Sequence, residues 1–581
     1  MKITLTNKWV SIILIALLPF YIVFLAEINS TQSLNDTLTF ILRRPTVIIF
    51  NLLFISLLLF SLTILFKKLY ISIIIVGGLL YILSLVEYFK HSVSSSHFLI
   101  TDITMVGNAA DIARFANISI HIWMVVNLIT LVSYAVACAR LKIRIESKPL
   151  SLRISGILIM VAAFWIILSP RISGYLYRAF DVDTRPSTNS FAANEKYANN
   201  SFLANLLQSS AESIASIVSE PDNYNANAIN SLTEKFAPSD QGKRPNIIFI
   251  ACESFSDFRC FPSLEIDSDV YRGFDAVTNM ETTATGYLFS PTFGGYTARA
   301  EFELITGLPV KSLQNATIPH YLIKDTKKTY SIARSLSDAS YYTSYIHPFS
   351  KSFYNRDDFY PRYGFHELIF DTDFDDLGIT PEYYGDYIND STAYNAIKSI
   401  LLRKDNAPNY IFTTTMQNHQ PYISEDDTLE FEVYLNAIKT SSDALHDFVL
   451  WLEKFEEETI LVFVGDHFPF FSSESLFYEN LGLNASNCEI LYKQQFIVYS
   501  NKERPDIDTS RIFSEFYLPG LVLKSAGAPL SKVNTAILSQ FESNPLYSTN
   551  ADDSTDSIPL FDLLTYDIVC GEAYALDDNS K

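Results

Sequence analysis

The most informative pattern in the sequence is a short apolar, β-branched run that ends in a residue able to bind a metal ion or a phosphate group. Four such runs occur in the second half of the chain, at residues 246–253, 343–347, 410–419 and 460–467. Continuous rather than alternating apolarity predicts strands buried on both faces, as in a parallel sheet flanked by helices. Ligands of such sheets bind just beyond the carboxyl ends of the strands. We therefore expect the last residues of these runs to line one site.

The first third of the chain holds long apolar stretches with few charges. A helix needs ~20 mostly apolar residues to cross a bilayer, and one such stretch alone would also suit a buried core helix. Five in succession predict a transmembrane domain with five helices over residues 1–170. The stretches are residues 10–28, 47–66, 69–86, 120–139 and the shorter 154–167. No small-x-small cleavage site follows the first stretch, so we do not interpret it as a signal peptide.

Lysine and arginine in the short loops predict the orientation of this domain. Lys8, residues 67–68 and the basic cluster at residues 140–153 fall on one side if the amino terminus is cytoplasmic, and residues 43–44 are the exception. With five spans, the rest of the chain then lies outside the cytoplasm. We expect a multi-pass protein of the cytoplasmic (inner) cell membrane whose catalytic domain faces the periplasm or the extracellular side.

The remainder of the chain divides into a connector and a soluble domain. Residues 171–243 are polar and rich in Asn, Ser and Ala, which indicates a juxtamembrane connector with one amphipathic helix at residues 202–218. Over residues 244–581 strand-like runs alternate with helical stretches, which predicts an exported α/β domain with a mostly parallel central sheet. Helices are expected at residues 298–306, 394–402, 433–455 and 560–569.

The charge of the chain excludes one class of partner. Lys and Arg number 43 against 64 Asp and Glu, a net charge of −21. Nucleic acids bind through many cationic contacts to phosphate, so we expect no nucleic-acid partner. The acidic residues are spread without a long run, as on an ordinary solvated surface.

Thr297 is the candidate nucleophile. Gly294 and Gly295 permit a tight turn, and the helix predicted from Ala298 places Thr297 at its amino terminus. The commoner use of a threonine there is to cap the helix. The alternative is that its hydroxyl faces an anion site, where free N–H groups and the helix dipole favour phosphate. A nearby metal ion would make this hydroxyl a nucleophile.

Glu253, Asp466 and His467 supply the remaining ligands for such a metal. Together with the oxygen of Thr297 they make a four-ligand site for a divalent cation. Mostly oxygen ligands with a single imidazole suit Mn²⁺ or Mg²⁺, and Zn²⁺ is an alternative. Each residue alone would more often have an ordinary loop or surface role, but their joint position at strand ends and a helix start favours the metal site.

His347, Arg356 and His419 form a second candidate group for binding substrate. Each histidine follows a predicted strand, and Arg356 lies in the polar stretch after His347. Arginine binds phosphate through a planar fork of N–H groups, and histidine exchanges protons with phosphoryl or alkoxide oxygens. The alternative for Arg356 is a salt bridge with Asp357 or Asp358, and for either histidine a structural hydrogen bond.

Several motifs of the soluble domain form a specific set when taken together. They are residues 246–255, Gly294-Gly-Tyr-Thr-Ala-Arg-Ala-Glu301-Phe-Glu303, His347 with Tyr354-Asn-Arg356, Asn418-His-Gln-Pro-Tyr422, Gly465-Asp-His467 and Leu564-Thr-Tyr-Asp567. With five amino-terminal spans before it, this set resembles the lipoteichoic acid synthase-like branch of the sulfatase/alkaline phosphatase superfamily.

The resemblance implies that the exported α/β domain has the sulfatase/alkaline phosphatase fold, and it also implies a reaction. Glu253, Thr297, Asp466 and His467 would bind one metal ion, usually Mn²⁺ in this branch, and His347, Arg356 and His419 would hold a phosphoglycerol group. Thr297 would attack a membrane phospholipid donor such as phosphatidylglycerol, and a hydroxyl of an envelope glycan or polymer would then accept the group.

Two alternatives stay open at this point. A phosphoethanolamine transferase of the same superfamily would share the metal and the threonine but need a different headgroup pocket. A catalytically silent, membrane-tethered lipid sensor would keep the fold, although such a protein is expected to have lost ligands that are all present here. A true sulfatase is disfavoured, because the Cys/Ser-x-Pro-x-Arg motif is absent at Thr297-Ala-Arg.

Overall fold

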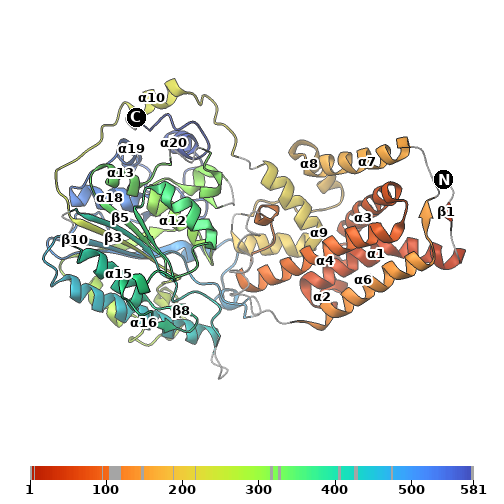
Figure 1. The fold of residues 1–581 in the computed structure, drawn as a ribbon, viewed down its shortest axis with the longest axis horizontal. Coiled ribbons are helices and arrows are strands. Elements are labelled where there is room, and N and C mark those ends of the chain that lie inside the picture. The colour runs from red at the N-terminus through yellow and green to blue at the C-terminus, as the bar shows by residue number, and fades with distance from the viewer. Residues whose placement is uncertain are drawn as a thin grey trace. The chain divides into compact units, whose positions relative to one another are not determined.

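A computed structural model describes residues 3–4, 7–94, 96–103, 120–145, 150–187, 189–215, 218–314, 318–324, 329–403, 407–423, 429–472 and 475–576. These residues form two compact units, one drawn from Met1–Val106 and Ala116–Ile217 and the other from Val218–Lys581. Figure 1 shows a helical amino-terminal unit and an α/β unit. Each is described by itself.

The amino-terminal unit consists of helices, with one two-residue pairing between β1 and β2. Its elements are β1 (Ile3–Thr4), α1 (Lys8–Thr31), α2 (Leu34–Arg43), α3 (Pro45–Phe66), α4 (Leu69–Ser94), α6 (Ile122–Arg140), β2 (Arg144–Ile145), α7 (Leu150–Leu168), α8 (Pro170–Ala179) and α9 (Ser190–Ala215). Among the described residues, α1, α3, α4 and α6 are long and apolar enough to cross a membrane. They correspond to the first four predicted spans.

The fifth predicted span, residues 154–167, lies in α7. Residues Arg153–Leu168 and Arg171–Ala179 pass the same test only as a pair bent by 88°. The bend falls at Ser169 and Pro170, because Pro170 lacks the N–H that a continuous helix would use. The described part of the chain therefore holds four candidate spans, or five if the bent pair counts as one.

The segment expected to be a connector divides between the two units. Helix α9 contains most of the predicted amphipathic helix, and its backbone breaks at Ser201 (φ 55°, ψ −171°). Its apolar residues, among them Phe202, Leu203 and Leu207, join the core of the helical unit. The spacing of apolar residues predicted this helix. The polar residues around it indicated a connector and gave no sign that the helix packs against the membrane-spanning helices.

The α/β unit is built on a sheet in which the described strands follow the order β12-β4-β11-β10-β3-β9-β5-β6. The strands are β3 (Asn246–Cys252), β4 (Thr283–Phe289), β5 (Tyr342–Ile346), β6 (Glu367–Ile369), β9 (Asn409–Thr414), β10 (Thr459–Gly465), β11 (Lys493–Ser500) and β12 (Phe513–Ser514). Only β11 among these runs against its neighbours, so the sheet is mixed and mostly parallel. A separate hairpin joins β7 (Tyr383–Tyr384) to β8 (Tyr387–Ile388).

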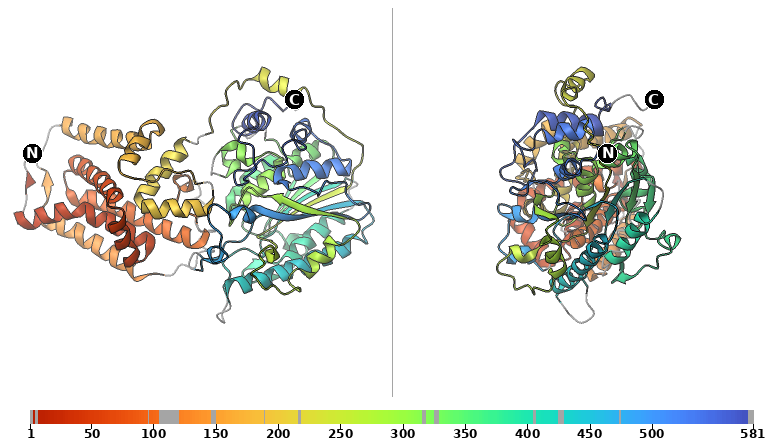
Figure 2. Two further views of the ribbon diagram at one scale, coloured as in Figure 1. Left: turned by 180° about the vertical axis from the view of Figure 1, so that it is seen from behind. Right: turned by 90° about the vertical axis from the view of Figure 1, so that its left-hand side faces the viewer.

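Helices cover both faces of this sheet (Figures 1 and 2). They are α10 (Ala226–Thr233), α11 (Arg272–Thr278), α12 (Thr297–Thr306), α13 (Ile332–Asp338), α14 (Arg356–Phe359), α15 (Asp390–Leu401), α16 (Glu430–Leu452), α17 (Phe477–Asn480), α18 (Leu518–Ala526), α19 (Lys532–Leu538) and α20 (Pro559–Val569). All four helices predicted from the sequence are present, as α12, α15, α16 and α20.

The four predicted strands are neighbours at the centre of the sheet. Strands β10, β3, β9 and β5 pair in parallel in that order. Every residue of β3 and β10 is buried, because helices pack on both faces and leave no solvated side. The continuous apolar runs are therefore confirmed as central strands, and their carboxyl ends share one edge.

Candidate active site

The register of the central strands brings Glu253 and Asp466 together. Gly465 at the end of β10 lies opposite Cys252 at the end of β3. The next residue on each chain is a carboxylate, so Asp466 and Glu253 leave the sheet side by side, and His467 follows Asp466. These are the residues that the strand-end pattern predicted.

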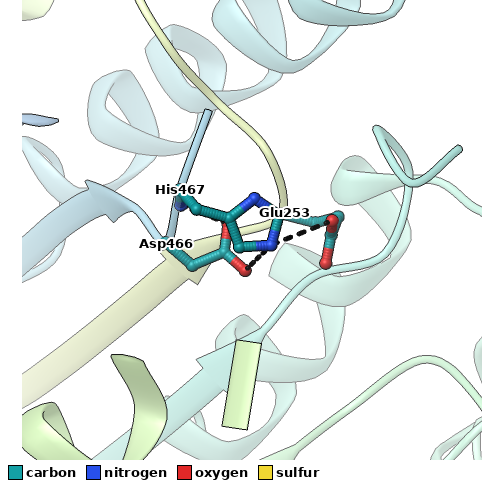
Figure 3. Close-up of side chains that lie close together, drawn as sticks. All are labelled: Glu253, Asp466 and His467. Carbon is teal, nitrogen blue, oxygen red and sulfur yellow. Dashed lines mark hydrogen bonds and ion pairs between the residues drawn. The ribbon is translucent and has the colours of Figure 1, made fainter. Parts of the chain in front are cut away.

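Glu253, Asp466 and His467 form a buried group that could hold a metal ion. One ligand atom from each lies within 4.8 Å of the others. His467 Nε2 is 3.3 Å from Asp466 Oδ2 and 3.9 Å from Glu253 Oε1. Figure 3 shows the three side chains pointing toward one another. Among the described residues, these are the three His, Cys, Asp or Glu side chains that lie close enough together to hold a metal ion.

Neighbouring groups fix the orientation of these ligands. Ser254 has a left-handed backbone (φ 50°), which lets its N–H donate to Asp466 Oδ1 at 2.7 Å and its hydroxyl donate to Glu253 Oε1 at 2.8 Å. The N–H of His467 also donates to Asp466 Oδ1, at 2.8 Å. Nδ1 of His467 lies 2.9 Å from the Phe468 carbonyl, so Nδ1–H donates there. Nε2 is then the ring nitrogen that faces Glu253 and Asp466, and metal-binding histidines are commonly oriented in this way by a hydrogen bond from their other ring N–H.

A cation suits this donor set. Asp466 Oδ2 is buried and has no hydrogen-bond partner in the described residues, although it faces His467 Nε2. Burial and the charge of Asp466 raise the pKa of Glu253 well above its ordinary value. Burial also raises the pKa of Asp466, against the lowering effect of His467. A divalent cation would reverse both shifts.

Thr297 lies at the start of α12 and faces the same group. Its hydroxyl oxygen is 3.4 Å from Glu253 Oε2 and 3.4 Å from His467 Nε2. Gly294 and Gly295 reach this turn with φ of 71° and 141°, a region that other residues rarely adopt. Gly294 N–H donates to the Phe468 carbonyl at 3.0 Å, which ties the turn to the segment after His467. The hydroxyl is thus directed at the acidic group, and the interpretation of Thr297 as a helix cap loses support.

Arg356 and His347 lie together in the interior. His347 Nδ1–H donates to the Thr414 carbonyl at 3.0 Å, and Arg356 Nη1 donates to His347 Nε2 at 3.1 Å. Burial and the charge of Arg356 lower the pKa of His347 to about 3. The ring is therefore neutral at physiological pH and accepts from the arginine.

The partner of Arg356 was not foreseen. Arg356 Nη2 lies 3.1 Å from both carboxylate oxygens of Glu301. The described residues show no ion pair from Arg356 to Asp357 or Asp358, and Asp358 pairs with Arg362 at 2.8 Å instead. The alternative partners considered from the sequence were wrong, because neighbours in sequence point to the surface while Arg356 points inward. Glu301 stands four residues after Thr297, one helical turn on, and this spacing was the signal that could have found it.

His419 follows β9 and is held by its own segment. Nδ1–H donates to the Gln420 carbonyl at 2.5 Å, and the Tyr387 hydroxyl lies 3.3 Å from the same nitrogen. Burial lowers the pKa of His419 to about 4, and the charges of His467 and Arg356 act in the same direction. Its neighbour Asn418 donates to the Glu253 carbonyl at 3.1 Å.

The chain is similar in sequence to several known proteins. A family model described as Sulfatase matches residues 245–528. The capsular polysaccharide biosynthesis protein RkpI of Rhizobium meliloti (strain 1021) is 30% identical over 39% of this chain and 42% of its own length. The lipoteichoic acid synthase-like protein YvgJ of Bacillus subtilis (strain 168) is 24% identical over 52% of this chain and 48% of its own. The chain thus spans about half the length of the curated relatives it matches.

A solved structure shares the fold. The Streptococcus pyogenes phosphoglycerol transferase GacH, in complex with sn-glycerol-1-phosphate, superposes with a TM-score of 0.51 at 19% identity. The match covers 62% of this chain and 97% of that one. At this identity the likeness concerns the fold, so roles of individual residues rest on the geometry above.

Proposed function

Because this chain belongs to the sulfatase/alkaline phosphatase superfamily, as a distant homologue of its lipoteichoic acid synthase-like members, we propose that it is a membrane-anchored, metal-dependent phosphoglycerol transferase. The donor would be a phospholipid such as phosphatidylglycerol. The acceptor would be a hydroxyl of an envelope glycan or polymer, in line with the relative named for capsular polysaccharide biosynthesis.

One observation carries the proposal. The Thr297 hydroxyl lies 3.4 Å from Glu253 Oε2 and 3.4 Å from His467 Nε2, at the start of a ten-residue helix. Backbone N–H groups at such a terminus favour a phosphate group in front of them. A hydroxyl placed between metal-binding side chains and a phosphate site is the arrangement that nucleophilic phosphoryl transfer needs.

Glu253, Asp466, His467 and the Thr297 oxygen would hold one divalent cation, Mn²⁺ by preference, with Mg²⁺ or Zn²⁺ as alternatives. When bound, it would lower the pKa of the hydroxyl and neutralise charge on the phosphoryl oxygens. The unpartnered oxygen of Asp466 supports this assignment.

The transfer would take place in two balanced steps. First, Thr297 Oγ forms a bond to phosphorus while the bond from phosphorus to the diacylglycerol oxygen breaks, and the threonine proton ends on diacylglycerol. Second, an acceptor hydroxyl attacks the phosphoglycerol-threonine, the phosphorus–Thr297 bond breaks, and the acceptor proton returns to Thr297. His347, Arg356 and His419 would hold and orient the phosphoglycerol group through both steps.

The amino-terminal spans support a location at the membrane. With the bent pair counted as a fifth span and the lysine- and arginine-rich loops inside, the α/β unit would lie outside the cytoplasm, and its tether would keep it at high effective concentration near lipid donors.

The test uses full-length protein in detergent, with Thr297→Ala beside it, incubated with labelled phosphatidylglycerol and Mn²⁺. We expect metal-dependent release of diacylglycerol and a phosphoglycerol mass increment on the Thr297 peptide, both in the wild type alone. If phosphatidylglycerol gives neither diacylglycerol release nor an adduct, and phosphatidylethanolamine gives an ethanolamine-phosphate adduct, the donor is phosphatidylethanolamine rather than phosphatidylglycerol. Absence of both adducts would overturn the transferase.

A further inference from the structure

Helix α12 carries two fully buried glutamates that differ in their protonation. Glu301 and Glu303 are 0% and 3% exposed. Burial alone would raise both pKa values. Arg356 and His347 instead lower the pKa of Glu301 to about 2. Burial prevails at Glu303, whose pKa rises to about 8. At neutral pH one helix therefore presents an ionised carboxylate on one side and a mostly neutral carboxyl group on another.

Hydrogen-bond donors from several elements surround the ionised carboxylate of Glu301. Oε1 accepts from the Tyr345 hydroxyl on β5 at 3.0 Å and from the Thr414 hydroxyl on β9. Oε2 accepts from the Tyr360 hydroxyl. Both oxygens lie 3.1 Å from Arg356 Nη2. A buried charge with this many partners is held in one place.

The N–H groups of Arg356 are divided between this carboxylate and two other acceptors, and one of them has no acceptor among the described residues. Nη2 is used by Glu301, while Nη1 donates to His347 Nε2 at 3.1 Å and to the Phe353 carbonyl at 3.2 Å. Nε is buried and has no hydrogen-bond partner in the described residues. The rings of Tyr354 and Tyr360 lie 5.1 and 5.9 Å from the guanidinium. Glu301 thus takes one edge of the guanidinium and leaves Nε–H for another acceptor.

We propose that Glu301 is a positioning residue of the phosphate site, which acts through Arg356. Glu301 lies one helical turn from Thr297 and holds the guanidinium of Arg356 against His347. Its carboxylate also offsets the charge of Arg356, so that a phosphoryl oxygen is bound in one orientation. Because the helix that carries Thr297 also carries Glu301, the nucleophile and the phosphate-binding arginine are fixed to the same element. This inference rests on the proposed function and adds a residue that the strand-end pattern does not contain.

The first test compares Glu301→Gln with Glu303→Gln. Glutamine preserves the shape of both side chains, but at Glu301 it removes the charge that holds Arg356. We expect kcat of Glu301→Gln to fall ~10–100-fold while KM for phosphatidylglycerol changes less than about 3-fold, because an anion still binds but is misplaced. Glu303→Gln replaces a mostly neutral group and is expected to stay within about 2-fold of wild type. Wild-type kcat in Glu301→Gln would overturn the proposal.

A double variant separates positioning from a structural role. If Glu301 acts through Arg356, the activity of the double variant Glu301→Gln/Arg356→Gln is expected to be less than about 2-fold below that of Arg356→Gln alone. Arg356→Gln alone leaves an unpaired buried carboxylate, so the double variant is expected to melt at a higher temperature than that single variant. A further tenfold loss of activity in the double variant would show that Glu301 acts elsewhere. If Glu301→Gln does not fold, Tyr360→Phe removes one of its donors, and an unchanged kcat in that variant would overturn the proposal.

Binding of sn-glycerol-1-phosphate distinguishes failure of this inference from failure of the proposed function. If the wild type turns over no lipid donor but binds this probe, the proposed transferase activity is overturned and the positioning role of Glu301 can still be tested. In that case Glu301→Gln is expected to retain the probe and Arg356→Gln to lose it by at least tenfold. Loss of the probe in Glu301→Gln would contradict the positioning role. A wild type that neither reacts nor binds the probe would overturn both.

Discussion

Asp466 Oδ2 and His467 Nε2 lie 3.3 Å apart in the protein interior, and the carboxylate oxygen accepts no hydrogen bond from any described residue. His467 Nδ1 lies 2.9 Å from the Phe468 carbonyl, so Nε2 is the ring nitrogen that faces the carboxylate. A buried carboxylate oxygen without a hydrogen bond is unfavourable in a site shielded from water, and a divalent cation held by Asp466 and His467 would compensate its charge.

Purified wild-type protein is expected to bind about one equivalent of divalent metal per chain, and Asp466→Asn to lose at least ~100-fold in affinity. The amide has half the acceptor oxygens and no charge, so it is a poor ligand for a hard cation. At a metal concentration of 100 Kd, binding would stabilise the wild type by about 2.7 kcal/mol, which raises Tm by several degrees. Elemental analysis and thermal unfolding with and without a chelator measure both effects.

The matched control is Asp390→Asn. Asp390 is as buried as Asp466, at 0% exposed, and also has one oxygen without a partner in the described residues. Its other oxygen accepts from the Ser441 hydroxyl at 2.5 Å, and it has no place among the three candidate ligands. Asp390→Asn should keep its metal. Equal loss of metal in both variants would mean that burial, rather than coordination, explains the result.

Thr297→Ala is expected to lose activity without losing stability. The described hydrogen bonds of the hydroxyl go to Glu253 and His467 at 3.4 Å, which is long for a stabilising bond. We expect kcat to fall ~10³-fold or more, as for removal of a nucleophile, and Tm to change by about 1 °C or less. Thr297→Ser keeps a hydroxyl and should retain measurable activity. A drop in Tm of several degrees would favour a structural role for Thr297.

Much of the fold followed from local pattern. The central strands are buried on both faces, so their apolar runs are continuous, and the register of a parallel sheet then places their last residues together. Glu253, Asp466 and His467 could be predicted for this reason. The remaining strands, such as β4 and β11, are partly exposed and lack this signal: Tyr287 of β4 is 48% exposed.

The buried network around Arg356 could not be predicted in the same way. Glu301, Tyr345 and Thr414 come from a helix and two strands that meet only after the chain has folded. A glutamate in an amphipathic helix usually faces water, and its sequence neighbours do not indicate that it is ionised in the core. The partner of Arg356 therefore became visible only in three dimensions.

The α/β unit is expected to be sensitive to acid because it buries neutral histidines. Burial lowers the pKa of His320 to about 4 from an ordinary value of 6.5, and lowers those of His347 and His419 to about 3 and about 4. Between pH 6.5 and 4 the unfolded chain binds these protons and the folded chain does not. The stability that these histidines contribute therefore rises with pH in this window and is lost as pH falls through it. Each histidine would lower the free energy of unfolding by on the order of 3 kcal/mol at pH 4, relative to neutral pH.

His320→Gln tests this account outside the candidate active site. His320 Nε2–H donates to the Tyr354 carbonyl at 2.9 Å, and a glutamine amide can replace that donor without titrating. We expect the variant to lose less stability between pH 6.5 and 4.5 than the wild type, as measured by chemical unfolding at each pH. Identical pH dependence of the two proteins would contradict a buried neutral His320.

Gly465→Ala is expected to damage the site through the backbone. A Cβ at Gly465 would lie 1.8 Å from the Phe255 carbonyl oxygen, so β10 could accept it only by moving away from the segment that follows Glu253. That shift would weaken the bond from the Ser254 N–H to Asp466, now 2.7 Å long, and separate the candidate ligands. We expect a loss of about 1–3 kcal/mol in stability, as for an overpacked core.

The metal content of Gly465→Ala gives the sharper measurement, because the affected backbone connects directly to the ligands. We expect metal affinity to fall at least tenfold, although no ligand has been changed. The control is Gly174→Ala in helix α8, where an added Cβ would have no neighbour within 4 Å. Alanine has the higher helix propensity, so this control should be neutral or more stable by about 1 kcal/mol and should bind metal as the wild type does. Full metal affinity in Gly465→Ala would show that β10 tolerates the shift, and that the register of β3 and β10 is not what holds Glu253 and Asp466 together.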